Sequence, residues 1–121
     1  MTKRIVISLA LSALAMPAMA DCRDPTTQTE MNRCAALALS KADDELNSTY
    51  SKLIRQLDKS QQAEVKSIQL LWIRFKDQSC KYEASGAEGG SLQPLLRDTC
   101  LTRLTEDRTR DLKDWVKTAG Q

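Results

Sequence analysis

The sequence contains no histidine, and this absence excludes much common enzyme chemistry. Without histidine there is no Ser-His-Asp triad, no Cys-His dyad and no His-ligated metal site. Only two Trp, two Tyr and one Phe are present, too few for a platform that stacks the bases of single-stranded nucleic acid. Four Gly and three Pro in 121 residues favour helices over a turn-rich β-sandwich. The composition therefore predicts one all-α domain.

The first 20 residues have the pattern of a cleaved signal peptide. A basic start is followed by an apolar segment at 5–16 and by small residues that fit a signal-peptidase site before Asp21. The apolar segment is shorter than the ~20 residues of a membrane helix, so we expect no membrane span in the mature chain. The sequence thus predicts a signal peptide over 1–20 and a single periplasmic or secreted domain over 21–121.

The mature chain is formally neutral. Of the 18 Lys and Arg residues, Lys3 and Arg4 lie in the predicted signal peptide, and the remaining 16 equal the 16 Asp and Glu in number. A neutral chain lacks the basic excess typical of nucleic-acid-binding domains. We therefore expect no nucleic-acid partner.

Apolar residues at helical spacing predict a first helix over 28–57. Thr27 and Glu30 have the spacing of a capping box at its start. Its expected buried face is formed by Leu39, Ala42, Leu46, Tyr50, Leu53 and Leu57.

Two further helices follow. Asp58 and Gln61 are expected to cap the second helix, which fades near residues 82–85. Its expected buried face is formed by Val65, Ile68, Leu71, Trp72 and Phe75. Ser91 is expected to cap the third helix, with Pro94 in its first turn. Its expected apolar stripe is formed by Leu96, Cys100, Leu104, Leu112 and Trp115. The prediction is a small three-helix bundle of two consecutive antiparallel hairpins.

Four cysteines in a small exported domain predict two disulfides. No C-x-x-C pair is present, so the spacing does not fit a zinc finger. Cys22 precedes the first helix and reaches Cys34 on it, whereas Cys80 and Cys100 flank the same loop, which favours sequential pairing. Cys34 is also expected at the same end of the bundle as Cys80, so a bridge between Cys34 and Cys80 stays open as an alternative.

Residues 86–91 contain three of the four glycines, which indicates a tight reversal with positive φ angles. This loop lacks the pattern of a phosphate-binding loop. We predict that it and its flanks bind a partner protein through Tyr82, Glu83, Gly86, Glu88, Gly89, Gly90, Ser91 and Leu92.

The acidic runs at 43–45 and 106–111 are interleaved with basic residues, as on solvated helix faces. They have neither calcium-loop spacing nor a clear catalytic pair, so we expect no enzyme activity, no cofactor and no metal. Arg108 interrupts an apolar stripe and is expected to pair with a carboxylate or carbonyl. We predict a polar network that links the helices through Asn47, Tyr50, Trp72, Arg74, Asp77 and Arg108.

Three runs carry a family resemblance: ADDELNSTY at 42–50, WIRFKDQSC at 72–80 and EGGS at 88–91. With Cys22, Cys34, Cys100 and Arg108, they resemble the lysozyme inhibitor LprI-like family of exported bacterial proteins. The resemblance implies a four-cysteine helical domain with bridges Cys22–Cys34 and Cys80–Cys100. It also implies inhibition of lysozyme.

We therefore expect a periplasmic or secreted protein-binding module, with lysozyme as the partner that the family suggests. The alternative is an envelope structural or adaptor protein that docks through an exposed helix face and has no effect on lysozyme.

Overall fold

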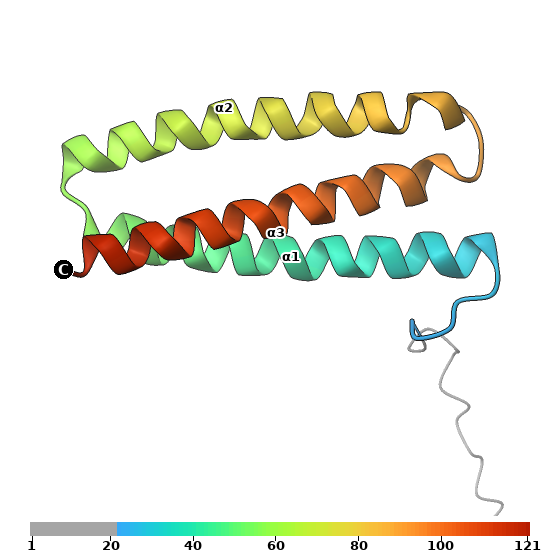
Figure 1. The fold of residues 1–121 in the computed structure, drawn as a ribbon, viewed down its shortest axis with the longest axis horizontal. Helices are drawn as coiled ribbons and strands as arrows, with labels where there is room; N and C mark the ends of the chain where they lie inside the picture. Colours follow the sequence, from blue (N-terminus) through green and yellow to red (C-terminus); the bar gives the residue numbers. More distant parts are fainter. Residues whose placement is uncertain (1–21) are drawn as a thin grey trace, which may run out of the picture.

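The computed structural model describes residues 22–121, and the predicted signal peptide lies outside the described residues. The predicted all-α fold is confirmed, with three long helices: α1 (Gln28–Gln56), α2 (Lys59–Glu83) and α3 (Gln93–Ala119). A short 3-10 helix, η2 (Ser85–Ala87), lies between α2 and α3. α2 runs antiparallel to both α1 and α3 (Figure 1). Among the described residues, no helix has the length and apolar character that crossing a bilayer requires.

The first two helices begin at the predicted capping boxes. The Glu30 N–H donates to Thr27 Oγ1 at 3.1 Å, and the Glu30 carboxylate accepts from the Thr26 and Thr27 N–H groups at 2.8 and 3.3 Å. These backbone donors hold the pKa of Glu30 below its usual value. At α2 the Gln61 N–H donates to Asp58 Oδ1 at 2.8 Å, and the Gln61 side chain accepts from the Asp58 N–H. Both helix starts are therefore set by local sequence.

The start of α3 differs from the prediction. Leu92 occupies the N-cap position without a side-chain cap, and Pro94 lies in the first turn as expected. Ser91 does not cap the helix. Its carbonyl oxygen instead accepts a hydrogen bond of 2.8 Å from the side-chain amide of Asn32 on α1. Ser91 lies one residue before the N-cap position.

α3 packs along α1 extensively and along α2 over a smaller interface, whereas the backbones of α1 and α2 come close together at few positions. Small side chains on the buried faces permit the close approach of α1 and α3: Ala42, Thr49, Thr105 and Thr109. Thr49 and Thr109 donate to the carbonyls of Glu45 and Thr105 within their own helices, so their hydroxyls are satisfied locally. The bundle is therefore an α1–α3 pair with α2 laid against α3.

Two apolar clusters hold this arrangement. The larger one brings together Leu46 and Leu53 of α1, Val65 of α2 and Leu112 of α3. The smaller one surrounds the second disulfide and contains Cys80, Cys100 and Leu101. The two cores lie at different levels of the bundle, and polar side chains are buried between them.

The predicted buried face of α2 is partly wrong. Val65 is buried and Trp72 is half-buried, but Ile68, Leu71 and Phe75 are 37%, 62% and 60% exposed. α2 instead turns Gln69 and Cys80 inward, because Gln69 meets a buried arginine of α3 and Cys80 is bonded to Cys100. Because these two contacts set the orientation of α2 about its axis, the apolar side chains at 68, 71 and 75 face solvent.

The stripe predicted on α3 is also displaced. Cys100 and Leu112 are buried, but Leu96 is 37% exposed. The buried face of α3 includes Leu101, Thr105 and Thr109, because α3 contacts both of the other helices and must bury two adjacent faces.

Both predicted disulfides are confirmed. Cys22 is bonded to Cys34 and Cys80 to Cys100, with Cα–Cα distances of 5.5 and 5.4 Å. The N-terminal end of α1 and the α2–α3 connection lie at the same end of the molecule (Figure 1). Both bridges therefore brace that end.

Replacing Cys80 and Cys100 together by alanine is expected to lower the free energy of unfolding by about 3–4 kcal/mol, because the bridge closes a loop and its sulfurs are buried. The paired alanine change at Cys22 and Cys34 is expected to lower it by only about 2–3 kcal/mol, because that loop is shorter and Cys22 is exposed. Urea unfolding of both double variants under oxidising conditions measures this order. Equal losses, or the reverse order, would contradict it.

Candidate functional site

The connection between α2 and α3 is a sequence of tight turns. The Ala87 N–H donates to the Ala84 carbonyl at 3.1 Å, and the Gly90 N–H donates to the Ala87 carbonyl at 2.9 Å. Gly89 has a φ of +77°, whereas the other loop glycines have negative φ. The prediction of positive φ angles is therefore correct for Gly89 alone. The loop, residues 84–92, is built from successive short hydrogen-bonded turns.

Contacts from all three helices fix this loop. The Cys80–Cys100 bridge joins its two flanking helices, and Asn32 of α1 donates to the Ser91 carbonyl. Arg103 of α3 donates to Glu83 of α2 at 2.8 Å. A loop that is cross-linked and hydrogen-bonded in this way is ordered before it meets a partner, which lowers the entropic cost of binding.

The fixed loop and the adjoining end of α2 display one aromatic, one aliphatic and one acidic side chain. Tyr82 is 80% exposed, Leu92 is 43% exposed, and Glu88 is exposed. Glu83 is already engaged by Arg103, so among the predicted loop residues Glu88 is the carboxylate available to a partner. Gly86, Gly89, Gly90 and Ser91 contribute backbone geometry rather than side-chain contacts. The loop residues thus form a small amphipathic surface at the end of the bundle.

Changing Gly89 to alanine is expected to lower the free energy of unfolding by about 1–2 kcal/mol, because a Cβ disfavours its positive φ. Gly86→Ala is the matched control, since Gly86 has no positive φ and no atom within 4 Å of the added Cβ. Urea unfolding of the two variants compares them. The geometry described here is incorrect if Gly86→Ala is the more damaging change.

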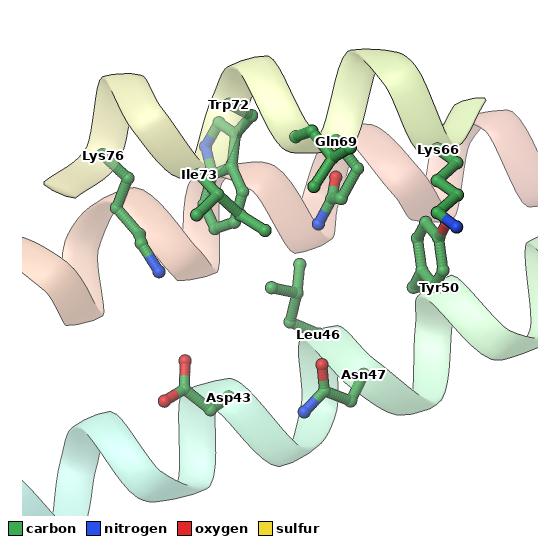
Figure 2. Close-up of a pocket in the computed structure, with 10 residues that line it drawn as sticks. Asp43, Leu46, Asn47, Tyr50, Lys66, Gln69, Trp72, Ile73 and Lys76 are labelled. Carbon is green, nitrogen blue, oxygen red and sulfur yellow. The ribbon is translucent and has the colours of Figure 1, made fainter. Parts of the chain in front are cut away.

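A second surface feature is a groove between α1 and α2 (Figure 2). Its volume is about 360 Å³, and it lies where the backbones of these two helices stay apart. The α1 wall contributes Asp43, Leu46, Asn47 and Tyr50. The α2 wall contributes Lys66, Gln69, Leu70, Trp72, Ile73 and Lys76. The groove therefore combines apolar side chains with amides and charges of both signs.

A buried arginine lies directly behind the groove. Arg108 of α3 is 7% exposed, and its Nε donates to Gln69 Oε1 at 3.0 Å. Its guanidinium also lies over the Trp115 ring, 4.8 Å from the centroid. Burial lowers the pKa of Arg108, and the nearby charge of Asp111 acts in the opposite direction. The expectation that Arg108 finds a carbonyl oxygen is confirmed, with the side-chain amide of Gln69 as the partner.

The structure gathers only part of the predicted polar network. Asn47, Tyr50 and Trp72 line the groove, and Arg108 reaches it through Gln69. Asp77 Oδ1 lies 3.7 Å from Lys76 Nζ, and Arg74 is exposed.

Sequence reasoning missed Gln69 and Lys76 as groove residues. The signal that identifies them is their position on the stripe of 65, 69, 72, 76 and 80, at spacings of three and four.

Neither surface has the composition of a metal centre. Within residues 22–121 no group of three or more His, Cys, Asp or Glu side chains is placed to hold a metal ion.

The fold and the site define the class of this protein: a small three-helix domain with two disulfides at one end, a fixed loop and a lateral groove. The chain belongs to the lysozyme inhibitor LprI family, whose model matches residues 19–112.

Two other proteins are similar to this chain. An uncharacterized protein of Rhizobium meliloti (strain 1021) is 31% identical over an alignment 112 residues long, and the match covers 82% of this chain and 81% of the relative. The crystal structure of a DUF1311 family protein from Pseudomonas putida KT2440 has a TM-score of 0.69 and 21% identity, and the match covers 76% of this chain and 95% of that one. This second similarity establishes a shared fold.

The Arg108–Gln69 contact predicts an asymmetric pair of variants. Gln69→Leu is expected to lower the free energy of unfolding by about 2–3 kcal/mol, because it leaves the buried guanidinium without its Nε partner. Arg108→Met is expected to cost less, since the Gln69 amide it frees lines the groove. The double variant is expected to be more stable than the sum of the two losses predicts. A double-mutant cycle by urea unfolding tests this, and strict additivity would contradict the contact.

Proposed function

We propose that this protein is an exported inhibitor of lysozyme that binds the enzyme with the fixed loop at residues 84–92 and with Tyr82 at the adjoining end of α2. Membership of the lysozyme inhibitor LprI family is the observation that carries this proposal. The two disulfides support an extracytoplasmic site of action, since such bonds persist in oxidising compartments.

The loop has the properties of an inhibitor's contact surface. Its conformation is held by the Cys80–Cys100 bridge, by the hydrogen bond from Asn32 to Ser91 and by the Arg103–Glu83 contact between the flanking helices, so little freedom is lost on binding. Tyr82 supplies a large exposed aromatic side chain, the type that dominates binding energy at protein interfaces. Glu88 supplies a negative charge that attracts a basic enzyme such as lysozyme.

A second candidate function, a docking protein of the bacterial envelope, is favoured by one specific observation. Ile68, Leu71 and Phe75 form an exposed apolar stripe along α2. Stripes of this kind mark docking faces in helical adaptor proteins. This candidate predicts no effect on lysozyme activity.

A cell-wall lysis assay with purified, oxidised residues 21–121 tests the inhibitor. We expect the protein to slow lysis by lysozyme at micromolar concentration. Tyr82→Ser and Glu88→Lys are each expected to raise the inhibition constant roughly tenfold or more, because they remove the anchor and reverse the charge.

Phe75→Ser is the matched control for Tyr82→Ser, because Phe75 is an exposed aromatic residue on the same helix but outside the loop. It is expected to inhibit as well as the unmodified protein. Lysis unaffected by the unmodified protein would rule out the inhibitor and favour the docking protein. Inhibition that Phe75→Ser abolishes and Tyr82→Ser leaves intact would rule out the loop as the binding surface.

A further inference from the structure

The groove between α1 and α2 has a different charge pattern on each wall. The α2 wall presents the ammonium groups of Lys66 and Lys76, and the α1 wall presents the Asp43 carboxylate and the Asn47 amide. Figure 2 shows Asp43 and Lys76 at one end of the groove and Lys66 and Tyr50 at the other. A ligand in this groove therefore has ammonium groups on the α2 side and a carboxylate and an amide on the α1 side.

The two lysines are not equivalent. Lys76 already lies over the Trp72 ring at 5.0 Å from its centroid and 3.7 Å from the Asp77 carboxylate. Lys66 has no carboxylate within ion-pair distance among residues 22–121. The free positive charge of the groove is therefore at the Lys66 end.

Two further donors lie near Lys66. The Oε1 atom of Gln69 accepts from the buried Arg108, which fixes the amide so that its NH₂ group points towards the groove (Figure 2). Tyr50 lines the same groove, at the end where Lys66 lies (Figure 2). An ammonium, an oriented amide NH₂ and a phenol hydroxyl together make a site for a carboxylate.

An apolar patch adjoins this donor cluster. Leu46 is buried at the base of the groove, and Trp72 and Ile73 flank it on α2. A volume of about 360 Å³ lies at the lower end of the range for small-ligand sites, so it suits one large side chain and its neighbouring backbone. The groove thus combines a carboxylate site with a pocket for one apolar side chain.

We propose that this groove binds the C-terminus of a peptide whose last residue is large and apolar. The terminal carboxylate is held by Lys66, Gln69 and Tyr50, and the last side chain packs on Leu46, Trp72 and Ile73. Backbone N–H groups of the peptide donate to Asp43 and Asn47 on the opposite wall. A fatty acid has a carboxylate and an apolar chain but no N–H group for that wall. This site is separate from the loop and goes beyond the proposed inhibition of lysozyme.

The test is a titration of oxidised residues 21–121 with two probes, followed by ¹H–¹⁵N NMR. The probes are acetyl-Leu-Leu with a free C-terminal carboxylate and the same dipeptide as its C-terminal amide. We expect the acid to shift amide resonances in 43–50 and 66–76 and to bind roughly tenfold or more tightly than the amide, because charge-assisted hydrogen bonds are lost with the carboxylate.

Two variants of matched chemistry locate the charge. Lys66→Met keeps the aliphatic stem and removes the ammonium, and it is expected to weaken binding of the acid roughly tenfold. Lys59→Met changes an exposed lysine of the same helix outside the groove and is expected to leave binding unchanged. Dispersed spectra of both variants verify that they are folded.

Equal affinity for the acid and the amide would overturn the proposal, as would the absence of shifts in the groove at millimolar probe. A third probe, acetyl-Leu-Glu amide, carries its charge on a side chain. Tighter binding of this probe than of acetyl-Leu-Leu would overturn the assignment to a C-terminus. Dodecanoate that binds as tightly as acetyl-Leu-Leu would overturn the role of the α1 wall. The lysozyme assay is independent of all these outcomes, because the inhibitor proposal rests on residues 84–92.

Discussion

The arrangement of this bundle depends on how α2 is held. α1 and α3 lie against each other through small side chains, and α2 joins this pair mainly along α3, with Val65 in a cluster that also contains Leu46 and Leu53 of α1. Three contacts fix it there: the Cys80–Cys100 bridge at one end, the Arg108–Gln69 hydrogen bond in the middle and the packing of Val65 at the other end. A helix held along one side by a few specific contacts exposes much of its remaining surface, as the exposed Leu71 and Phe75 illustrate.

Both candidate surfaces follow from this constraint. The groove exists because α2 is kept on α3 and away from α1, and its polar lining includes Gln69, which Arg108 orients from behind. The loop is ordered because the Cys80–Cys100 bridge joins the two helices that flank it. Asn32 of α1 also donates a hydrogen bond to the Ser91 carbonyl in the loop. Stability and binding geometry thus depend on the same residues. Such coupling is typical of small exported domains whose hydrophobic cores are limited.

The features that local sequence determines were predictable. The capping boxes at Thr27 and Asp58 gave correct helix starts. The cysteine positions favoured the observed bridges but left a Cys34–Cys80 pairing open, and the family resemblance implied the pairing that is observed. The orientation of α2 was not predictable from periodicity, because its sequence carries two neighbouring stripes at helical spacing. One contains Val65 and Trp72, and the other contains Ile68, Leu71 and Phe75. The stripe with Ile68, Leu71 and Phe75 is the more apolar of the two. The stripe with Val65 and Trp72 nevertheless faces inward, because the Cys80–Cys100 bridge and the Arg108–Gln69 contact set the rotation of α2. For the same reason the groove residue Gln69 was missed, since its role depends on an arginine 39 positions away.

Hydrogen–deuterium exchange before and after reduction of the disulfides tests most directly whether α2 is held separately from an α1–α3 pair. The account predicts that reduction accelerates exchange across the second half of α2 and the loop by a larger factor than in the centres of α1 and α3. It also predicts that a variant with alanine at Cys22 and Cys34, which retains the Cys80–Cys100 bridge, keeps α2 protected until reductant is added. Uniform acceleration in all three helices, or faster exchange confined to α1, would contradict the account.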